Sequence, residues 1–424
     1  MEKAWLITVN MGYGHQRTVF PLKDLAFNGK IINANDYEGI SRKDREIWET
    51  TRKFYEFISN FKRIPLVGEF SFFIFDQFQK ILSFYPKRDL SKSSLTLREI
   101  YSLFKKGWGQ NLIDRFKKNP LPLVSAFFTP AFMAEFFNYP GEIFCIICDA
   151  DIARPWAPLY PFSSRIKYFA PNKRVVERLK LYGVKPENIF LTGYPLPLEN
   201  IGTEKIEVLR HDLSYRLLNL DPDKRYFRKY YPLIEKYLGN LPKEPNHPLT
   251  LMFAVGGAGA QKEIGAKILK SLQRKIKEKK IKVILVAGTK EWIKDYFLQT
   301  IKGLDLENDW VEVIFESKIE DYFKKFNLAL RKTDILWTKP SELSFYTALG
   351  LPIIIAPPIG SQEDFNRDWL LRLGSAILQE NPNYTDQWLF DLLDSGWLAE
   401  GAMQGFVEGE KLGTFNIKRI ILNV

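Results

Sequence analysis

The sequence predicts an α/β protein with two parallel sheets, one in each half of the chain. Strand-length apolar runs alternate with helix-length segments in the first half, and the same alternation starts again at Thr250 after a polar stretch. Such alternation is typical of βαβ units around a parallel sheet. The chain has 424 residues, 46% of them hydrophobic, which is enough apolar material for two globular domains. The simplest architecture consists of two Rossmann-like domains that face each other.

The first half contains the first series of strand-like and helix-like segments. They occupy residues 4–10, 18–27, 30–35, 121–128, 131–137, 142–149, 166–170, 173–182 and 189–192. The alternation is interrupted at residues 41–119, a segment rich in Phe, Lys and Arg. Its apolar positions, among them Phe54, Phe57, Phe75 and Phe78, recur at helical spacing. We therefore expect an amphipathic helical insertion in this part of the chain.

The aromatic stripe of this insertion has two interpretations. A basic, aromatic helix face can lie on an anionic membrane or grip a lipid acceptor. A stripe of Phe residues can equally be the side of a helix that packs on its own domain. The sequence leaves both interpretations open.

A polar stretch rich in Tyr and Lys, residues 195–248, separates the two halves and contains a predicted helix near 226–238. The second half then alternates again through residues 250–255, 261–279, 282–287, 290–302 and 311–315, and after Lys339 come another helix and a strand at 353–356. We predict an N-terminal domain over residues 1–245 and a C-terminal domain over residues 246–424. The C-terminal tail is expected to pack back on the N-terminal domain.

Composition and charge limit the cellular setting. The chain has 61 Lys and Arg against 50 Asp and Glu, a formal charge of +11, which favours anionic surfaces or substrates, although a basic protein without such a partner is an alternative. An apolar strand follows Met1-Glu2-Lys3 directly, without the pattern of a cleaved signal peptide. The most apolar segment, residues 70–84, is interrupted by Asp76 and Lys80 and is not a predicted membrane span. We expect a cytoplasmic protein that is soluble or peripheral to a membrane.

Two cysteines, Cys145 and Cys148, have the spacing of a redox C-x-x-C motif. They lie in a continuous apolar run that is typical of a buried strand, so we favour core packing over redox chemistry. Two thiols without a matching His/Cys cluster also argue against structural zinc.

Polar residues gather where predicted strands of the first half end. Gly12, Gly14 and His15 follow the first strand, and a histidine in such a loop suits proton transfer or anion contact, although it can also cap the helix. Asp149 and Asp151 follow the apolar strand at 142–148, where they could act as general base or metal ligands, or simply cap a turn. No further acidic cluster has metal-ligand spacing, so we predict no metal site.

The second half has a glycine-rich turn at the corresponding place. Gly256, Gly257 and Gly259 follow the strand at 250–255 and open a helix, an arrangement that brings backbone N–H groups to a phosphate. The turn lacks the Lys-Ser/Thr of a P-loop, so diphosphate binding fits it better than ATP hydrolysis. Tight packing of the strand on the helix is the alternative.

The segment at residues 337–367 is the most informative part of the chain. A short strand leads to Lys339-Pro340, a helix with Glu342, a Gly350-Leu-Pro stop, another strand, and then a polar loop at 360–366. In open parallel sheets, ligands bind beyond the carboxyl ends of the strands, where helix N-termini meet anionic phosphates. The segment is therefore a candidate nucleotide site.

Together these motifs resemble GT-B-type glycosyltransferases of the group that contains monogalactosyldiacylglycerol synthases and the peptidoglycan N-acetylglucosaminyltransferase. The resemblance covers both halves but omits residues 41–119 and the polar stretch. It rests on the loop 12–15, the element 148–156, the segments 170–172 and 193–195, the turn 256–260, and the segments 339–340, 350–352 and 360–366. Arg154 stands where the family has His, and Glu342 lies one helical turn before the position of the family's ribose-binding Glu.

The resemblance implies roles for individual residues. His15 or Asp149 would deprotonate the acceptor hydroxyl, and Gly12, Gly14, Arg154 and Trp156 would lie on the acceptor side. Donor contacts would come from Gly256, Gly257, Gly259, Lys339, Glu342, Ser361, Gln362 and Glu363. The N-terminal domain would bind the acceptor and the C-terminal domain the nucleotide-sugar. Helix dipoles and basic side chains would stabilise the leaving diphosphate without a metal.

We therefore predict a GT-B inverting hexosyltransferase that moves a sugar from a UDP-linked donor to an acceptor hydroxyl, carried by a lipid in one reading of the insertion. It would need no cofactor, since the nucleotide-sugar is a substrate. An anionic membrane surface is an expected partner, nucleic acid is not, and no oligomeric state is predicted. A nucleotide-sugar 2-epimerase and a non-catalytic nucleotide-sugar-binding protein are the alternatives on the same fold.

Overall fold

The computed structural model describes residues 4–50, 81–254, 256, 259, 261–307, 309–358 and 361–423. The chain forms two compact units. The first comprises Met1–Pro195, Ile359–Asn366 and Leu412–Val424, and the second comprises Leu196–Pro358 and Arg367–Lys411. Each unit contains one six-stranded parallel sheet, as the alternation of the sequence predicts.

The sheet of the first unit has the strand order β2-β1-β3-β4-β5-β6, with every neighbouring pair parallel. Its strands are β1 (Ala4–Thr8), β2 (Ala26–Asn33), β3 (Leu123–Ser125), β4 (Ile143–Ile146), β5 (Lys167–Ala170) and β6 (Ile189–Leu191). All residues of β3 and β4 are buried, which explains why they read as continuous apolar runs rather than alternating ones.

The first unit also contains several helices. They are α1 (Tyr13–Val19), α4 (Leu95–Lys105), α5 (Gln110–Lys117), α6 (Phe128–Phe136), α7 (Lys173–Leu181) and α17 (Gly413–Leu422). In the C-terminal helix α17, Ile417 and Ile421 join the core cluster that contains Leu6 of β1 and Phe144 of β4. The last residues of the chain therefore complete the core of the first unit.

The first helix differs from the prediction. A single helix is predicted at 18–27, but α1 begins at Tyr13 and gives way at Phe20 to a 3-10 helix, Phe20–Leu25. Pro21 lacks a backbone N–H and so cannot continue the hydrogen bonding of an α-helix. The following strand accordingly begins at Ala26, earlier than the predicted residue 30.

The predicted insertion at 41–119 is described in part. Residues 42–50 are helical and α4 and α5 follow, but the apolar positions from Phe54 to Phe78 lie outside the described residues. In the described part, Phe104, Trp108 and Phe116 are almost fully buried. These aromatic residues are core residues of the first unit.

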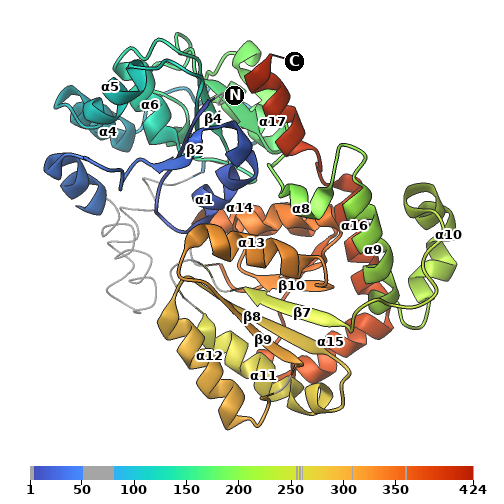
Figure 1. Ribbon diagram of the computed structural model, residues 1–424. Coiled ribbons are helices and arrows are strands. Elements are labelled where there is room, and N and C mark those ends of the chain that lie inside the picture. The colour runs from blue at the N-terminus through green and yellow to red at the C-terminus, as the bar shows by residue number, and fades with distance from the viewer. Residues whose placement is uncertain are drawn as a thin grey trace. The chain divides into compact units, whose positions relative to one another are not determined.

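The sheet of the second unit has the strand order β12-β11-β10-β7-β8-β9, again parallel throughout. Its strands are β7 (Thr250–Ala254), β8 (Lys282–Gly288), β9 (Val311–Phe315), β10 (Ile335–Thr338), β11 (Ile353–Ile355) and β12 (Ala376–Leu378). The helices α11 (Lys262–Lys277) and α12 (Glu291–Gly303) lie on one side of this sheet, and α13 (Ile319–Leu330) lies on the other (Figure 1). This is the doubly wound arrangement that positions ligands at a crossover of strand order.

The remaining helices of the chain include those of the polar stretch. They are α8 (Leu198–Ile201), α9 (Glu207–Leu220), α10 (Arg225–Leu238), α14 (Ser361–Leu373), α15 (Thr385–Asp394) and α16 (Trp397–Glu408). The prediction assigns residues 196–245 to the N-terminal domain, but the structure places them in the second unit. The physical reason is buried Arg216 of α9, whose guanidinium donates to the carbonyls of Thr333, Leu349, Gly350 and Leu330 at 2.7–3.3 Å.

The helix predicted after Lys339 is a 3-10 helix, Glu342–Leu349, with every residue buried. A Cβ added at Gly405 of α16 would lie 2.2 Å from Thr347 Oγ1, and one added at Gly409 would lie 2.6 Å from Ala348 Cβ. The 3-10 helix and α16 can therefore approach this closely only because glycines face the contact.

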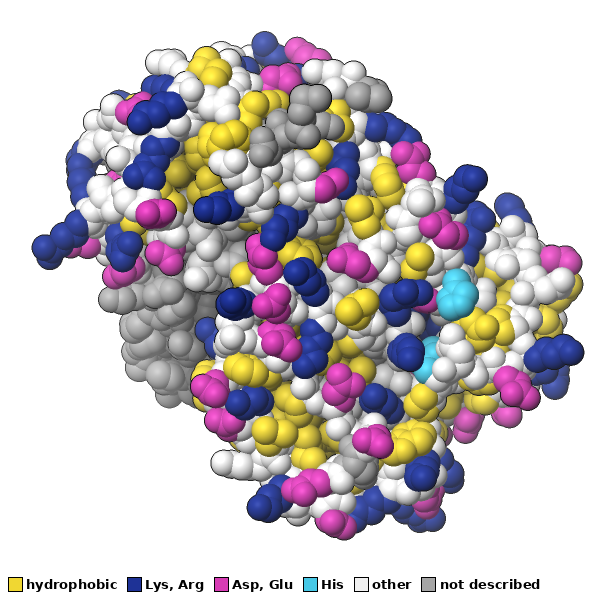
Figure 2. Space-filling view, in the orientation of Figure 1, with side chains coloured by type: hydrophobic (Ala, Val, Ile, Leu, Met, Phe, Trp, Pro, Cys, Tyr) yellow, Lys and Arg dark blue, Asp and Glu magenta, His cyan; other side chains and the backbone are white. Residues whose placement is uncertain are grey.

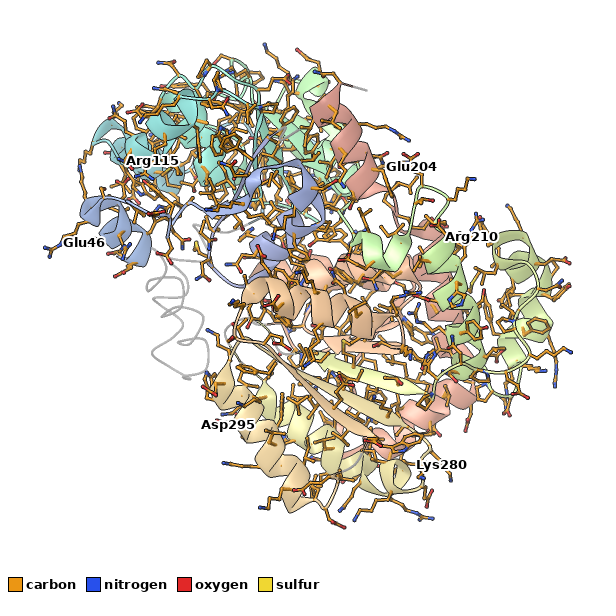
Figure 3. All side chains as sticks on the ribbon, viewed as in Figure 1. Glu46, Arg115, Glu204, Arg210, Lys280 and Asp295 are labelled. Carbon is orange, nitrogen blue, oxygen red and sulfur yellow. The ribbon has the colours of Figure 1, made fainter. Side chains whose placement is uncertain are left out.

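On the face seen in Figure 2, basic and acidic side chains are interspersed and do not form one patch of a single sign. Exposed ion pairs such as Arg42 with Glu46, at 2.8 Å, are of the kind that contributes little to stability (Figure 3). Within the described ranges, no helix is both long and apolar enough to cross a lipid bilayer.

Candidate active site

The loop between β1 and α1 places His15 in the first turn of the helix. Gly12 precedes the helix with φ of 100°, a conformation that L side chains rarely adopt, so glycine is needed here. His15 Nδ1 lies 2.9 Å from the carbonyl oxygen of Ala126. A carbonyl can only accept a hydrogen bond, so Nδ1 carries the proton in the neutral ring. Nε2 is then the proton-accepting nitrogen, which is the tautomer that a general base requires.

The loop after β4 contains two carboxylates in different environments. The Asp151 side chain is 3% exposed and accepts hydrogen bonds from Arg178 at 2.8 Å, through Nε and Nη2, and from Arg174 Nε at 3.0 Å. Burial opposes the charge of Arg178, but the hydrogen bonds and charge of Asp151 raise the pKa of its guanidinium. Asp151 therefore anchors α7 to the loop.

Asp149 has a different partner. Its Oδ1 accepts a hydrogen bond of 3.0 Å from Nδ2 of Asn366, which lies on α14 and is fully buried. Cys148, the preceding residue, lies with Sγ 3.5 Å from His15 Nδ1. The structure thus brings the loops that carry His15 and Asp149 close together.

A cavity of about 420 Å³ lies beside these loops. Among the described residues, the polar groups on its wall include His15, Asp149, Thr96, Glu99 and Gln362. Most of the wall is apolar or aromatic, with contributions from Met11, Trp48, Ile81, Ile100, Leu103, Trp108, Phe127, Phe128, Ile152, Pro155 and Trp156. The cavity therefore suits a largely apolar molecule with a polar end that reaches His15 and Asp149.

The two predicted acceptor-side residues beyond Asp151 have unlike positions. Trp156 lies on the cavity wall, 6.4 Å from the His15 ring between centroids. Arg154 is buried and donates to backbone carbonyls, to Ser91 at 2.6 and 3.0 Å and to Ala157 at 2.6 Å. Burial lowers the pKa of Arg154. Its hydrogen bonds join the segment at 81–95 to the loop at 157–158, a structural task that the sequence did not predict.

The glycine-rich turn of the second unit lies against Lys339. A Cβ added at Gly256 would lie 2.5 Å from Lys339 Cε and 3.4 Å from its Nζ, so the lysine chain crosses the face of this glycine. Gly259 has φ of 72°, its N–H donates to the carbonyl of Gly256 at 2.8 Å, and a Cβ there would meet Trp292. The predicted donor residue Gly257 lies outside the described residues. The cationic side chain of Lys339 therefore lies beside the backbone of the glycine-rich turn.

The other predicted donor residues lie at the starts of two helices. Glu342 begins the 3-10 helix after β10 and is buried. Gln362 and Glu363 lie in the first turn of α14, and Glu363 is buried as well. The side chain of Ser361 lies outside the described residues. Of these four, Gln362 is on the cavity wall of the first unit.

The sequence also contains two features that bear on metal and thiol chemistry, its acidic residues and the pair Cys145 and Cys148. The described part of the chain contains no group of three or more His, Cys, Asp or Glu side chains that could hold a metal ion. Cys145 and Cys148 are buried and are not joined by a disulfide. Burial raises the pKa of the Cys145 thiol, so this side chain stays protonated and behaves as a core residue.

Comparisons with known proteins agree with the fold. Residues 242–308 match a family described as "Domain of unknown function (DUF6938)". Two curated proteins, each a processive diacylglycerol beta-glucosyltransferase, are 24% identical to this chain. The protein from Bacillus subtilis (strain 168) aligns over 214 residues and that from Bacillus licheniformis over 216, in both cases 50% of this chain and 45% of the relative. The matched segment thus spans less than half of each relative.

A solved structure extends the likeness over the whole chain. The Staphylococcus aureus MnaA–UDP co-structure has a TM-score of 0.50 and 14% identity, and the match covers 100% of this chain and 97% of that chain. Together with the two parallel six-stranded sheets, this likeness shows the two-domain α/β GT-B fold. The comparisons confirm the predicted resemblance to GT-B glycosyltransferases.

Proposed function

We propose that the protein is an inverting glycosyltransferase that moves a sugar from a UDP-linked donor to the hydroxyl of an apolar acceptor. The observation that carries this proposal is the cavity of the first unit, where His15 and Asp149 lie on a wall that is mostly aromatic and aliphatic. An acceptor with an apolar body would be held by that wall with its hydroxyl beside the two candidate bases. The diacylglycerol in the names of the curated relatives has this chemistry.

In the proposed reaction, His15 Nε2 or the Asp149 carboxylate takes the proton of the acceptor hydroxyl. The acceptor oxygen forms a bond to the anomeric carbon of the sugar from the face opposite the diphosphate. The bond between that carbon and the diphosphate breaks, and UDP leaves with the electron pair. A single displacement of this kind inverts the anomeric configuration.

The donor part of the proposal rests on the second unit. The Gly256 turn precedes α11, whose N-terminal end carries a partial positive charge, and Lys339 adds a full positive charge beside it. Both would stabilise the negative charge that develops on the leaving diphosphate. The proposal therefore requires neither a metal ion nor a resident cofactor.

An activity assay can test the proposal against its two alternatives. Purified protein is incubated with radiolabelled UDP-glucose or UDP-N-acetylglucosamine and dioleoylglycerol in micelles, and UDP release and labelled lipid are measured. Transfer to the lipid is the expected result. Conversion of the sugar at C2 without lipid labelling would indicate the epimerase, and UDP binding without either reaction would indicate a non-catalytic protein. Asp149→Asn and His15→Ala serve as controls for contaminating activity.

Peripheral membrane binding is a further part of the proposal. Tyr85, Leu95, Tyr160 and Phe162 are each more than 60% exposed, although all are large and apolar or aromatic. Tyr85 and Leu95 lie on the segment at 81–95, which also carries the exposed cations Lys87, Arg88 and Lys92, and Tyr160 and Phe162 closely follow the loop at 157–158 that Arg154 joins to it. Aromatic side chains next to basic ones are typical of proteins that lie on anionic bilayers.

Vesicle flotation tests this surface. The double variant Tyr160→Ser/Phe162→Ser should float clearly less with vesicles of phosphatidylglycerol and phosphatidylcholine than the unmodified protein does. The matched control, Trp292→Ser/Tyr384→Ser, removes two exposed aromatic residues from the second unit and should float normally. Equal flotation of both double variants would refute a membrane role for the first surface.

A further inference from the structure

Asn366 is a fully buried polar residue that contacts the candidate base Asp149. It lies on α14, 217 positions from Asp149 in the sequence. Its Nδ2 donates to Asp149 Oδ1 at 3.0 Å, and its Oδ1 accepts from the backbone N–H of Ala150 at 2.7 Å. Both ends of the amide therefore bind the same loop.

The orientation of this amide follows from its partners. A backbone N–H can only donate, so the amide oxygen of Asn366 must face Ala150. The NH₂ group then points to Asp149, whose ionised carboxylate can only accept. If the amide were flipped, its NH₂ group would face the N–H of Ala150 and its oxygen would face the Asp149 carboxylate. Neither pair can form a hydrogen bond, so the buried amide has one stable orientation.

Neighbouring residues hold this loop by its backbone or by Asp151. Asn172 Nδ2 donates to the carbonyl of Ala150 at 3.1 Å, and the Tyr182 hydroxyl donates to the carbonyl of Ile152 at 2.7 Å. Asn366 differs from them because it binds both the backbone N–H of Ala150 and the carboxylate of Asp149. It can therefore determine where that carboxylate points.

We propose that Asn366 is a positioning residue, which orients the Asp149 carboxylate toward the acceptor hydroxyl. Gln362 lies four positions earlier on the same helix, hence on the same helix face, and lines the cavity. The first turn of α14, where donor contacts are predicted, is thereby connected to the acceptor-side base through one side chain. The catalytic meaning of this contact rests on the proposed function, but the contact itself can be tested without any activity.

The substitution Asn366→Asp gives a specific test. It keeps the size of the side chain and the acceptor for Ala150, but it puts a second carboxylate where the NH₂ group was. Two carboxylates that close together cannot both ionise easily, so Asp149 should titrate about one pH unit or more higher than in the unmodified protein. The other titratable groups on the cavity wall, His15, Glu99 and Asp151, are the same in both proteins.

The titration is measured on the full chain by NMR of ¹³C-labelled aspartate side chains, with the Asp149 signal assigned from Asp149→Asn. Asn172→Asp is the matched control, because it adds a carboxylate beside the same loop at a residue that binds the carbonyl of Ala150 and not Asp149. A shift in Asn366→Asp that is much larger than in the control supports the proposal. Equal titration of Asp149 in the unmodified protein and in Asn366→Asp would overturn it.

Kinetics then separate this proposal from the proposed function. In Asn366→Ala, kcat should fall about 100-fold, the cost of a misplaced catalytic group, while the UDP affinity measured by calorimetry stays the same. In Asn366→Asp, the acid limb of the pH–rate profile should move to higher pH together with the NMR titration. If no sugar transfer is found with any donor, the proposed function fails while the titration still decides the contact. If Asn366→Ala melts early, the isosteric Asn366→Asp carries the test alone.

Discussion

Each unit of this protein contains a buried pair of ionisable side chains, and the two pairs lie at opposite edges of their sheets. In the first unit, Asp151 and Arg178 meet just beyond the carboxyl end of β4. In the second unit, His247 and Asp334 meet at 3.1 Å just before the amino ends of β7 and β10. Ligands of open parallel sheets bind at the carboxyl edge. The first network therefore lies at the ligand-binding edge of its sheet, whereas the second lies at the opposite edge.

Hydrogen bonding in the second network is consistent with a purely structural task. Asp334 is fully buried and accepts from His247 Nε2, from Asn219 Nδ2 at 3.0 Å and from the backbone N–H of Thr250 at 2.8 Å. These bonds connect α9 and the segment before β7 to β10. A buried carboxylate can therefore be interpreted as functional or structural only after the edge of the sheet on which it lies is known.

The largest expected effect is on turnover. Asp149→Asn should reduce kcat about 10²–10⁴-fold, the range typical of a lost general base, with UDP affinity unchanged. Asp334→Asn changes a carboxylate of the second network, and the folded protein should keep its turnover. The measurement is steady-state UDP release alongside a melting curve. If folded Asp334→Asn loses as much kcat as Asp149→Asn, the two edges do not differ in their importance for turnover.

The next effect is on stability. Asp151→Ala should lower the free energy of unfolding by about 3–5 kcal/mol, because it leaves the buried Arg178 charge uncompensated. The double variant Asp151→Leu/Arg178→Met should recover much of this loss, since an apolar pair needs no partner. Urea denaturation followed by tryptophan fluorescence measures both. If the double variant is as unstable as Asp151→Ala, the uncompensated charge of Arg178 is not the cause of the lost stability.

A smaller effect, on donor affinity, tests the second unit at its carboxyl edge. Gly256→Ala forces Lys339 from its path across the glycine and should weaken UDP binding about 10-fold, or about 1.4 kcal/mol. Gly303→Ala is the matched control, because a Cβ there meets nothing within 4 Å. Calorimetric titration with UDP compares the two. Equal affinities would remove Lys339 and its turn from the donor site.

The pH dependence of stability sharpens the account of the second network. Burial raises the pKa of Asp334 above its usual 3.8, although His247 and Arg216 oppose this shift. The native state then holds the proton more tightly than the unfolded state, so this contribution to stability is complete below pH 3.8 and is lost as the pH rises through the native pKa. The asparagine of the variant Asp334→Asn does not titrate, so the unfolding free energy of the unmodified protein minus that of the variant should fall as the pH rises from 3.8 through the native pKa. A difference that is independent of pH between 3.5 and 7 would contradict the raised pKa.

The sequence predicted the fold better than the details of the site. Strands and helices were predicted close to their observed positions wherever apolar periodicity was clear, as at β9 and α10. The predictions were less accurate where a local event changed the helix type, as at Pro21, and where one buried residue, Arg216, attached a segment to the other unit. Hydrophobic periodicity depends on residues that are close in the sequence. It does not indicate which distant groups the guanidinium of Arg216 will bind.

Candidate site residues show the same division. The ends of strands marked His15, Asp149 and the Gly256 turn, because loops at the carboxyl edge of a parallel sheet can be located from the strands alone. The same reasoning could not tell that Arg154 binds backbone carbonyls, or that Asn366 binds Asp149. The polar residues of the loop at 360–366 were a signal for Asn366, but nothing in the sequence indicated which of them is buried.

By itself, the sequence determined two parallel α/β sheets, the loops that lie at their ligand edges and the residue types available there. These properties depend on hydrophobic periodicity and on glycine positions, which act over a few neighbouring residues. Only the tertiary structure decided that Asp151 pairs with Arg178 and that Asp149 accepts a hydrogen bond from a distant amide. Such choices depend on burial and on hydrogen-bond partners that packing brings together from segments more than two hundred residues apart.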